Sequence, residues 1–390
     1  MSKSSSGDLK SLIPDKLKYY RSKGANLMTE SNNRLRPDET VQKILISTTS
    51  RMVGHYENKS IVITHALPSI YDSSAIFRML ETPFSRSGLM VAFETPPVEK
   101  RPGTVIPDHT YVGEIICAYL SVLFGKRFDL HGSVEANGRY QIPDITAYSR
   151  ICDPRLPFNS HEPRNCFPVP LNIDQVSLIE KVLFPDPGVD EKLLLRVQVI
   201  CKFYMRALQN AEYDPETGYL NLITAGEILS NFFQYSEEEM FDEETLRDLD
   251  LVRSKIEEGD KIAKRISNRF TSVKKVFVKS LCSLLDDSFY TASESEKKFV
   301  RRFEPEDIDK NIRAAYDLRS KYVHTGASFG KWIDTSGNHN DLQFGKPIVA
   351  DSKLAKILEK APKFIGFERL MRYCILKFMS SRGLLAVTPK

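Results

Sequence analysis

Apolar residues recur every three or four positions from residue 190 almost to the C-terminus, and this pattern constrains the fold more than any other feature. Side chains at this spacing share one face of an α-helix. Leu193, Val197 and Ile200 begin one such face, and residues 262–284 continue another for about six turns. Further helices are predicted at residues 223–233, 311–325, 354–358 and 367–379. The second half of the chain therefore predicts a bundle of four to five helices.

The first half has a different pattern. Residues 60–64 and 89–93 are short apolar runs between turn residues, which is typical of buried strands. Residues 127–142 alternate around Asn137 and Gly138, a hairpin signal. Helices are predicted at residues 38–48, 69–80 and 111–124.

These patterns divide the chain into four parts. Residues 1–36 are predicted to be a polar entry arm, and residues 37–145 a small α+β domain for sensing or docking. The many prolines of residues 146–188 indicate an extended connector, interrupted by a short helix at 174–184. Residues 189–390 form the bundle. The expected fold class is thus an α+β N-terminal domain followed by an all-α bundle, and mainly α overall.

The composition of the chain indicates the cellular environment in which the protein works. Hydrophobic residues make up 41% and charged residues 27% of the 390 residues, as in an ordinary globular protein. No apolar run reaches the roughly 20 residues that a membrane span needs, and the first residues lack the apolar core of a signal peptide. We therefore expect a cytoplasmic protein that has no membrane contact and keeps its cysteines reduced. Cys152, His161 and Cys166 lack zinc-site spacing, so neither a metal nor a cofactor is expected.

Charge is unevenly distributed, although the net charge is only +4. Residues 237–250 carry eight acids and one base, whereas residues 253–281 carry nine bases and three acids. One interpretation is two solvated helix faces of opposite sign. The other is a basic wall, including Arg265 and Arg269, that attracts a phosphate backbone. Both interpretations stay open.

Residues 311–326 read N-I-R-A-A-Y-D-L-R-S-K-Y-V-H-T-G and carry the main functional clue. Gly326 is predicted to stop this helix in a left-handed conformation, which places His324 in the last turn. Arg319 and His324 are five residues apart, or roughly 140° around a regular helix. One such helix cannot easily present both side chains to the same atom. Fraying of the end, or a second copy of the helix, would bring them together.

The segment Y-D-L-R-S-K-Y-V-H-T-G resembles the R-x4-6-H signature of HEPN domains, in particular their Apea-like branch. The resemblance implies an all-α bundle that is often dimeric, and in many members a metal-independent RNase. It also implies that Arg319 and His324 from two protomers line a cleft at the dimer interface, with Ser320 as the polar residue after the arginine. A second pair of this kind, Arg155 and His161, lies in a proline-rich loop and shows how chance supplies such spacing.

The residue types suit RNA cleavage. A histidine can act as base or acid near neutral pH. The planar guanidinium of an arginine can donate two parallel hydrogen bonds to two phosphate oxygens. Asp317 and Ser320 share a stripe with His324 and could orient its ring or the ligand, and Lys321 could contact RNA. The competing interpretation is that Arg319 pairs with a local acid and His324 merely caps the helix.

Two functions therefore stay open. The first is a metal-independent endoribonuclease that cleaves RNA by 2′-OH attack, as a homodimer joined through the C-terminal bundle. By resemblance it would be a toxin or antiviral-defence effector, with a protein trigger or antitoxin as a possible partner. The alternative is a non-catalytic HEPN-like module for dimerisation or for binding a nucleotide or protein. Residues 327–350, a long polar loop, are expected at the rim of any cleft as a substrate gate or a passive insertion.

Overall fold

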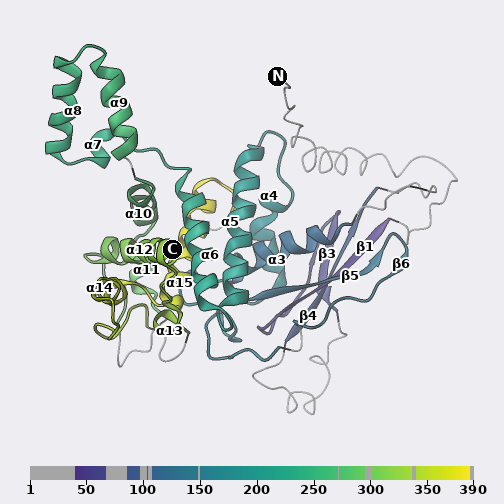
Figure 1. Cartoon of the computed structure of the whole chain (residues 1–390). Helices are drawn as coiled ribbons and strands as arrows, with labels where there is room; N and C mark the ends of the chain where they lie inside the picture. Colours follow the sequence, from purple (N-terminus) through teal and green to yellow (C-terminus); the bar gives the residue numbers. More distant parts are fainter. Residues whose placement is uncertain are drawn as a thin grey trace.

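The structure is a computed structural model, and it describes residues 40–66, 86–96, 103, 108–147, 150–270, 272–294, 301–335 and 340–386, without the side chains of residues 268–270. An antiparallel sheet occupies one end of the molecule, and helices make up the rest (Figure 1). The expected order of an α+β region followed by helices is thus confirmed. The predicted entry arm at residues 1–36 and the predicted helix at residues 69–80 lie outside the described residues.

Six strands form one antiparallel sheet in the order β2-β3-β4-β1-β5-β6. Their bounds are β1 Val41–Thr48, β2 Tyr56–Glu57, β3 Ile61–His65, β4 Ser87–Glu94, β5 Phe128–Ala136 and β6 Arg139–Tyr140. The strands predicted at residues 60–64 and 89–93 are confirmed as β3 and β4. The hairpin is also confirmed, since Asn137 (φ 52°) and Gly138 (φ 73°) both adopt the left-handed conformation that a two-residue turn of this kind requires.

Strand β1 corrects the prediction of a helix at residues 38–48. It lies inside the sheet and pairs with β4 on one side and β5 on the other. Ile44 and Ile46 are completely buried, which is the two-residue period of a strand. The prediction was wrong because Val41, Ile44 and Thr48 also fit helical spacing, and spacing alone cannot separate the two in a short apolar run.

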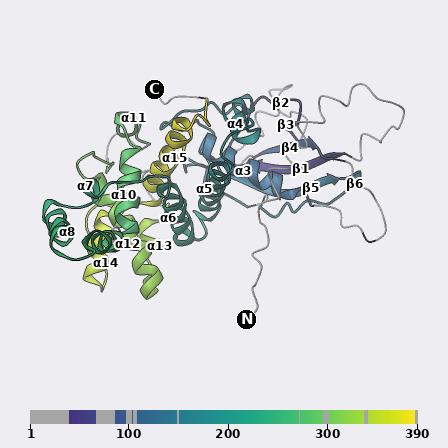
Figure 2. The ribbon, with the colours of Figure 1, turned by 90° about the horizontal axis from the view of Figure 1, so that it is seen from above.

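The helix predicted at residues 111–124 is confirmed as α3 (Thr110–Phe124), and it packs on β1 and β5 of the sheet. It approaches closely at Gly113, where a Cβ atom would lie 2.7 Å from both Ile44 Cγ2 and Leu130 Cδ1. Gly125 ends the helix in the left-handed conformation (φ 62°). Helix α5 packs on α3, so the sheet, α3 and the later helices stack in succession (Figures 1 and 2).

The described chain from residue 173 onward is mainly helical, as predicted for residues 174–184 and from residue 190 onward. Its helices are η3 Ile173–Ile179, α4 Glu180–Leu183, α5 Glu191–Asn210, α6 Pro215–Ser230, α7 Glu237–Met240, α8 Glu243–Lys255, α9 Gly259–Phe270, α10 Val273–Ser283, α11 Asp287–Thr291, α12 Ile308–Thr325, α13 Gly330–Ile333, α14 Ser352–Lys360 and α15 Phe364–Ser381. Within the described part of the chain, none of them is long and apolar enough to cross a bilayer.

The single six-turn helix predicted at residues 262–284 is wrong, because α9 and α10 are separate. Ser272 lies between them in an extended conformation, and its side chain accepts a hydrogen bond from the backbone N–H of Lys275. A serine in this position starts a new helix by capping its first turn. The apolar spacing continues across the break and therefore conceals it.

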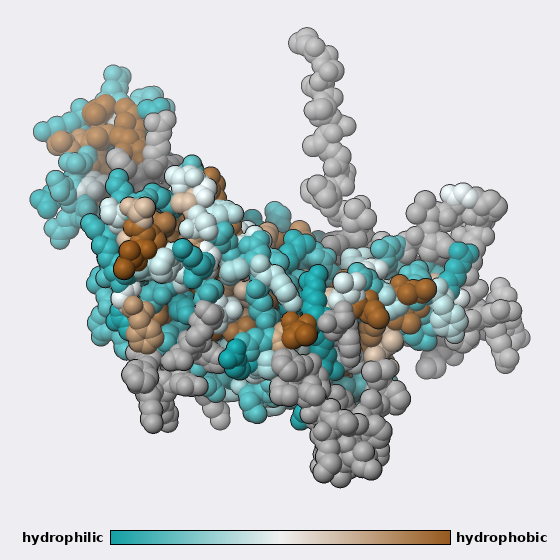
Figure 3. Space-filling view, turned by 60° about the horizontal axis from the view of Figure 1, so that its bottom comes forward, coloured by the Kyte–Doolittle hydropathy of each residue, from teal (hydrophilic) through white to brown (hydrophobic). Residues whose placement is uncertain are grey.

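Helices α7, α8 and α9 form a projecting arm with a small core of its own. Met240, Phe241, Leu249 and Ala263 are buried in that core and not in the main one. The arm stands away from the body in Figure 1, and Figure 3 shows apolar side chains gathered on it. On α10, Lys279 Nζ donates to the carbonyl oxygen of Glu239 (2.7 Å), which ties the base of the arm to the body.

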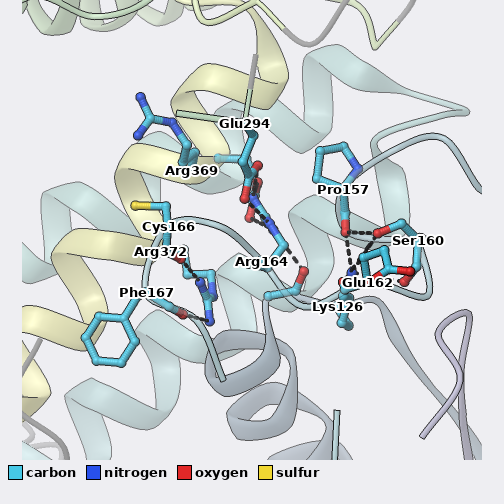
Figure 4. A network of polar contacts seen from close by, with 12 residues as sticks. Lys126, Pro157, Ser160, Glu162, Arg164, Cys166, Phe167, Glu294, Arg369 and Arg372 are labelled. Carbon is cyan, nitrogen blue, oxygen red and sulfur yellow. Dashed lines mark hydrogen bonds and ion pairs between the residues drawn. The ribbon is translucent and has the colours of Figure 1, made fainter. Parts of the chain in front are cut away.

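Residues 146–188, predicted as an extended connector, contribute to the core. Leu156, Phe158 and Cys166 are buried in the same continuous cluster as the sheet and the bundle. Lys126 is buried as well, and its Nζ donates to the carbonyl oxygens of Pro157 (2.5 Å) and Ser160 (2.9 Å; Figure 4). Burial lowers the pKa of this lysine well below its ordinary value.

Arg164 anchors the same segment through a buried ion cluster (Figure 4). Its guanidinium reaches Glu294 (Nε to Oε1, 2.5 Å) and Glu368 on α15 (Nη2 to Oε2, 2.6 Å), and its Nη1 donates to the carbonyl oxygen of Gly125 (2.8 Å). All three side chains are almost completely buried. Four remote parts of the chain therefore meet at one charged centre.

Helix α15 carries two further buried arginines. Arg369 is held by Asp341 (Nη2 to Oδ2, 2.7 Å) and lies over the ring of Phe289. Arg372 donates to the carbonyl oxygens of Val122 and Leu123 at the end of α3 (2.9 and 2.6 Å). Buried charges are tolerated only when paired or fully hydrogen-bonded, so these contacts fix the place of α15 relative to α3.

Candidate functional site

Helix α12 contains the motif and is regular to its end. It buries Ile312, Ala315 and Leu318 against the other helices. Gly326 (φ 66°) caps it in the predicted left-handed conformation, and its N–H donates to the carbonyl oxygen of Tyr322 (2.8 Å). The helix end is therefore not frayed. Positions 319 and 324 stay roughly 140° apart around the axis.

Arg319 is half-buried and faces α6. Its Nη2 lies 3.7 Å from Glu227 Oε1, an ion-pair distance too long for a hydrogen bond. The guanidinium carbon also lies 5.8 Å from the centre of the Tyr316 ring. About a third of the arginine side chain, 35%, remains exposed to solvent. Arg319 is thus loosely held and accessible.

Tyr316 and Arg319 share the carboxylate of Glu227. Burial, followed by a hydrogen bond to Glu227, raises the pKa of Tyr316 to about 12. The tyrosine therefore stays neutral beside the carboxylate that also attracts Arg319. Glu227 was not predicted from the sequence, because it lies near the end of α6, far from α12 along the chain, and no motif spacing links the two.

His324 lies in the last turn of α12 and is exposed. Among the described residues, no hydrogen bond or ion pair engages its ring. Its neighbour Val323 is exposed too, with 57% of its surface accessible. The imidazole is therefore open to a ligand or to another chain, whereas Arg319 points toward α6. A single chain does not bring the two side chains together.

The supporting residues are engaged elsewhere. Asp317 binds Lys274 on α10 through both carboxylate oxygens (2.6 and 2.7 Å). Lys321 Nζ lies 2.7 Å from Asp351 Oδ2 at the start of α14. This contact, followed by hydrogen bonds from the backbone N–H groups of Leu354 and Lys353, lowers the pKa of Asp351 to about 2. Ser320 is half-buried between Asp317 and Lys321 along the helix. Asp317 and Lys321 thus join α12 to α10 and α14.

The two arginines of the predicted basic wall belong to α9. Arg265 is exposed on the projecting arm, which Figure 1 shows apart from α12. The side chain of Arg269 lies outside the described part of the chain. The structure therefore does not place Arg265 beside Arg319 or His324.

The chance pair at Arg155 and His161 is unlike the motif. Arg155 is exposed and pairs with Asp153 (2.7 Å), and His161 Nδ1 accepts from the backbone N–H of Arg51 (3.1 Å). Both residues lie in irregular structure. They provide matched control positions for any test of the motif.

The loop after His324 is fastened to α6 over its first residues. Glu216 Oε1 accepts from Ser328 Oγ (2.7 Å) and from the backbone N–H groups of Phe329 (2.5 Å) and Gly330 (2.7 Å). The Phe329 ring also packs edge-on against Tyr322, two residues before His324. The start of the loop thus lies at the end of α12, the position predicted for a rim. Residues 336–339 are outside the described residues.

Comparison with known proteins identifies no relative: no family model, no curated protein and no solved structure matches the chain. Within the described residues, no group of three or more His, Cys, Asp or Glu side chains is placed to hold a metal ion. The geometry around α12 therefore carries the functional argument.

Proposed function

We propose that the protein is a metal-independent endoribonuclease whose active site forms where the α12 helices of two copies meet. The single observation that carries this proposal is the pair of accessible side chains, Arg319 and His324, on one short helix end. The resemblance of residues 316–326 to HEPN domains supports it. On this proposal the helices around α12 form a HEPN-like bundle, and the protein acts as a toxin or antiviral-defence effector.

The chemistry assigns a role to each side chain. One His324 removes the proton of the 2′-hydroxyl, whose oxygen attacks the phosphorus. Arg319 donates to the phosphate oxygens that gain charge in the transition state. The second His324 gives a proton to the departing 5′-oxygen. The products are a 2′,3′-cyclic phosphate and a 5′-hydroxyl, so atoms and charges balance without another reactant.

Two copies are needed because of the helix geometry. Arg319 faces α6, and His324 is roughly 140° away around α12. A two-fold axis beside the exposed end of α12 places the histidine of one copy near the arginine of the other. Such isologous contacts are the commonest in homo-oligomers. The dimer also supplies the two histidines that a base and an acid require.

A second candidate is a non-catalytic module that dimerises or binds a nucleotide or protein. The specific observation in its favour is the contact between Arg319 and Glu227, since an arginine with a local acid needs no substrate to balance its charge. In that case Arg319 joins α12 to α6, as Lys274 and Asp317 join α10 to α12. The exposed His324 then has no chemical task.

The alanine variants Arg319→Ala and His324→Ala separate the two candidates. We expect each to reduce RNA cleavage at least about 100-fold, since each removes a group that acts on the transition state. The matched controls Arg155→Ala and His161→Ala should cleave normally. Circular dichroism should show that all four variants are folded. Normal cleavage by either motif variant, or no cleavage by the wild-type protein, would favour the non-catalytic module.

A further inference from the structure

The exposed face of α14 is dominated by lysines. Lys353, Lys356 and Lys360 are all exposed, and at about 100° per residue they fall within an arc of about 60° around the helix. Leu354 and Leu358 lie on the opposite side and are buried. Among the described residues, no carboxylate oxygen lies within 4.0 Å of the three ammonium groups. We call these three residues the lysine stripe, and their charges are available to a partner.

The acidic side chains at the two ends of the lysine stripe are already paired. Asp351 at the start of α14 pairs with Lys321 (2.7 Å). Asp307 at the start of α12, which Lys360 attracts, pairs with Lys310 (2.7 Å). Both acids are thus neutralised by lysines outside the stripe.

The net charge of this region is positive, in contrast to that of the projecting arm. Residues 344–363 contain five lysines and only two acids, Asp351 and the half-buried Glu359. Residues 237–270, which contain the arm, carry eleven acids and seven bases. A polyanion is therefore attracted more strongly to α14 than to the arm.

An exposed aromatic side chain lies in the segment that leads into α14. Phe344 is 62% exposed, and Lys346, which follows two residues later, is exposed as well. Leu342 forms a β-bridge with Pro362, just after the end of α14. The segment therefore runs back along this helix and places Phe344 near the end that carries Lys360. Aromatic and basic side chains thus occur together, as on surfaces that bind single-stranded nucleic acid.

Helix α14 begins beside the candidate site. Near its start, Asp351 pairs with Lys321, which lies one turn before His324. Near its end, the carbonyl oxygen of Lys360 accepts from Asn311 Nδ2 (2.8 Å). The two helices are therefore neighbours that run in opposite directions (Figure 1). The lysine stripe, about 10 Å long at about 1.5 Å per residue, thus extends from the vicinity of His324 along α12.

We propose that the lysine stripe binds the backbone of single-stranded RNA and leads it to the candidate site, while Phe344 stacks on one of its bases. Lysine ammonium groups neutralise phosphates without reading the sequence. An aromatic ring stacks on bases that are not enclosed in a duplex. This inference rests on the proposed function for the identity of the substrate, and it adds the surface that binds the strand and the class of RNA.

Binding of a strand that cannot be cleaved tests this surface apart from the chemistry. The probe is a fluorescently labelled 2′-O-methyl RNA of mixed sequence, whose methyl groups block attack by the 2′-oxygen. Its anisotropy is measured with the protein in EDTA over a range of salt concentrations. The test variant replaces the whole stripe: Lys353→Gln, Lys356→Gln and Lys360→Gln. The matched control removes three exposed lysines from the arm: Lys255→Gln, Lys261→Gln and Lys264→Gln.

The salt dependence of binding gives the expected magnitude. For a single strand, each phosphate that a lysine neutralises contributes about 0.7 to the slope of log K against log salt concentration. We therefore expect the triple variant of the stripe to reduce this slope by about 2 and to weaken binding at least about tenfold at low salt. The triple variant of the arm should keep the wild-type slope.

Phe344 is tested separately, because stacking releases no counterions. Phe344→Ala should weaken binding about 5- to 100-fold without a change in the slope, and Phe344→Trp should bind like the wild-type protein. The control Tyr140→Ala removes an aromatic side chain that is 88% exposed on the sheet and should bind normally. Annealing the probe to its complement should abolish the effect of Phe344→Ala.

Three results would overturn this proposal: a wild-type slope in the stripe variant, an equal loss in the arm variant, or no binding of the probe by the wild-type protein. An effect of Phe344→Ala that persists with the annealed probe would overturn the assignment to single strands. A protein that binds the probe through the stripe but cleaves no RNA would overturn the proposed function alone. The two failures can therefore be distinguished.

Discussion

Arg164 provides the sharpest test of how the fold is held together. Replacing it with methionine keeps a long side chain but removes the guanidinium from the centre of the molecule. Glu294 then loses its hydrogen bonds from Arg164, Glu368 keeps only the hydrogen bond from Tyr204, and the carbonyl group of Gly125 loses a donor. Both carboxylates are at most 5% exposed, so water does not replace the arginine.

The magnitude follows from this burial. Removing one member of a buried ion pair costs about 3–5 kcal/mol, because the charge that remains is uncompensated. Because Arg164 pairs with two carboxylates, we expect Arg164→Met to lower the free energy of unfolding by about 5 kcal/mol, the upper end of this range. The control Arg155→Met removes an exposed pair with Asp153, where the arginine side chain is 84% exposed. Such a pair contributes about 0–1 kcal/mol.

The contribution of Glu294 to the free energy of unfolding should depend on pH in opposite directions in the wild-type protein and in Arg164→Met. In the wild-type protein, Arg164 lowers the pKa of Glu294 below its ordinary 4.5 despite burial. Glu294 therefore stabilises the fold above pH 4.5, and this contribution is lost as the pH falls through the lowered pKa. In Arg164→Met, burial is opposed only by the weaker attraction of Arg369 and Arg372, so we expect the pKa of Glu294 to rise. Its contribution is then largest at low pH and is lost as the pH rises.

Urea denaturation followed by circular dichroism at pH 5 and pH 8 measures both effects. We expect the midpoint of Arg164→Met to fall by about 1 M or more at pH 8, with a smaller difference at pH 5. Arg155→Met should follow the wild-type curve. If Arg164→Met has a normal midpoint at pH 8, or a larger deficit at pH 5 than at pH 8, the account of the buried cluster is wrong.

Three further predictions concern other parts of the fold. Gly125→Ala should lower the free energy of unfolding by about 1–3 kcal/mol, measured by urea titration, because the residue has φ 62° and its Cβ would lie 2.6 Å from Arg372 Nε. Glu216→Ala should speed limited proteolysis within residues 327–335, since it removes the acceptor of three donors. Lys321→Met should raise the pKa of Asp351 from about 2 toward its ordinary 3.8 in a carboxyl NMR titration. In the wild-type protein this ion pair supports the fold above pH 3.8, and its contribution is lost as the pH falls through about 2.

Local signals were sufficient for most of the elements. Helix α12 and its Gly326 cap follow from apolar spacing and from the ease with which glycine adopts the left-handed conformation. The Asn137-Gly138 turn follows from the same property. The predictions were wrong where the spacing of the apolar residues is compatible with two different structures. Residues 41–48 fit both a helix and a strand, and the spacing of residues 262–284 continues through the break at Ser272.

Long-range charge pairing could not be predicted. Glu368, Arg369 and Arg372 lie in consecutive turns of α15, where the sequence alone would suggest a solvent-exposed face. They are buried because partners from remote segments reach them, among them Arg164 and Asp341. No local pattern encodes such partners.

The candidate site shows the same limit. Arg319 and His324 were identified from the motif, and their separation around α12 follows from helix geometry alone. The contact of Arg319 with Glu227 depends on how α6 and α12 pack, which the sequence does not reveal. Asp317 and Lys321 were expected to serve the site. They instead hold neighbouring helices through Lys274 and Asp351.

The most direct test of the proposed function is to incubate the purified protein with total RNA in the presence of EDTA and to analyse the new RNA ends. The proposed mechanism predicts cleavage that the chelator does not slow, with 2′,3′-cyclic phosphate and 5′-hydroxyl ends. Specific activity should fall as dilution separates the two copies that share the site. Intact RNA, or cleavage that EDTA abolishes and magnesium restores, would contradict the proposal.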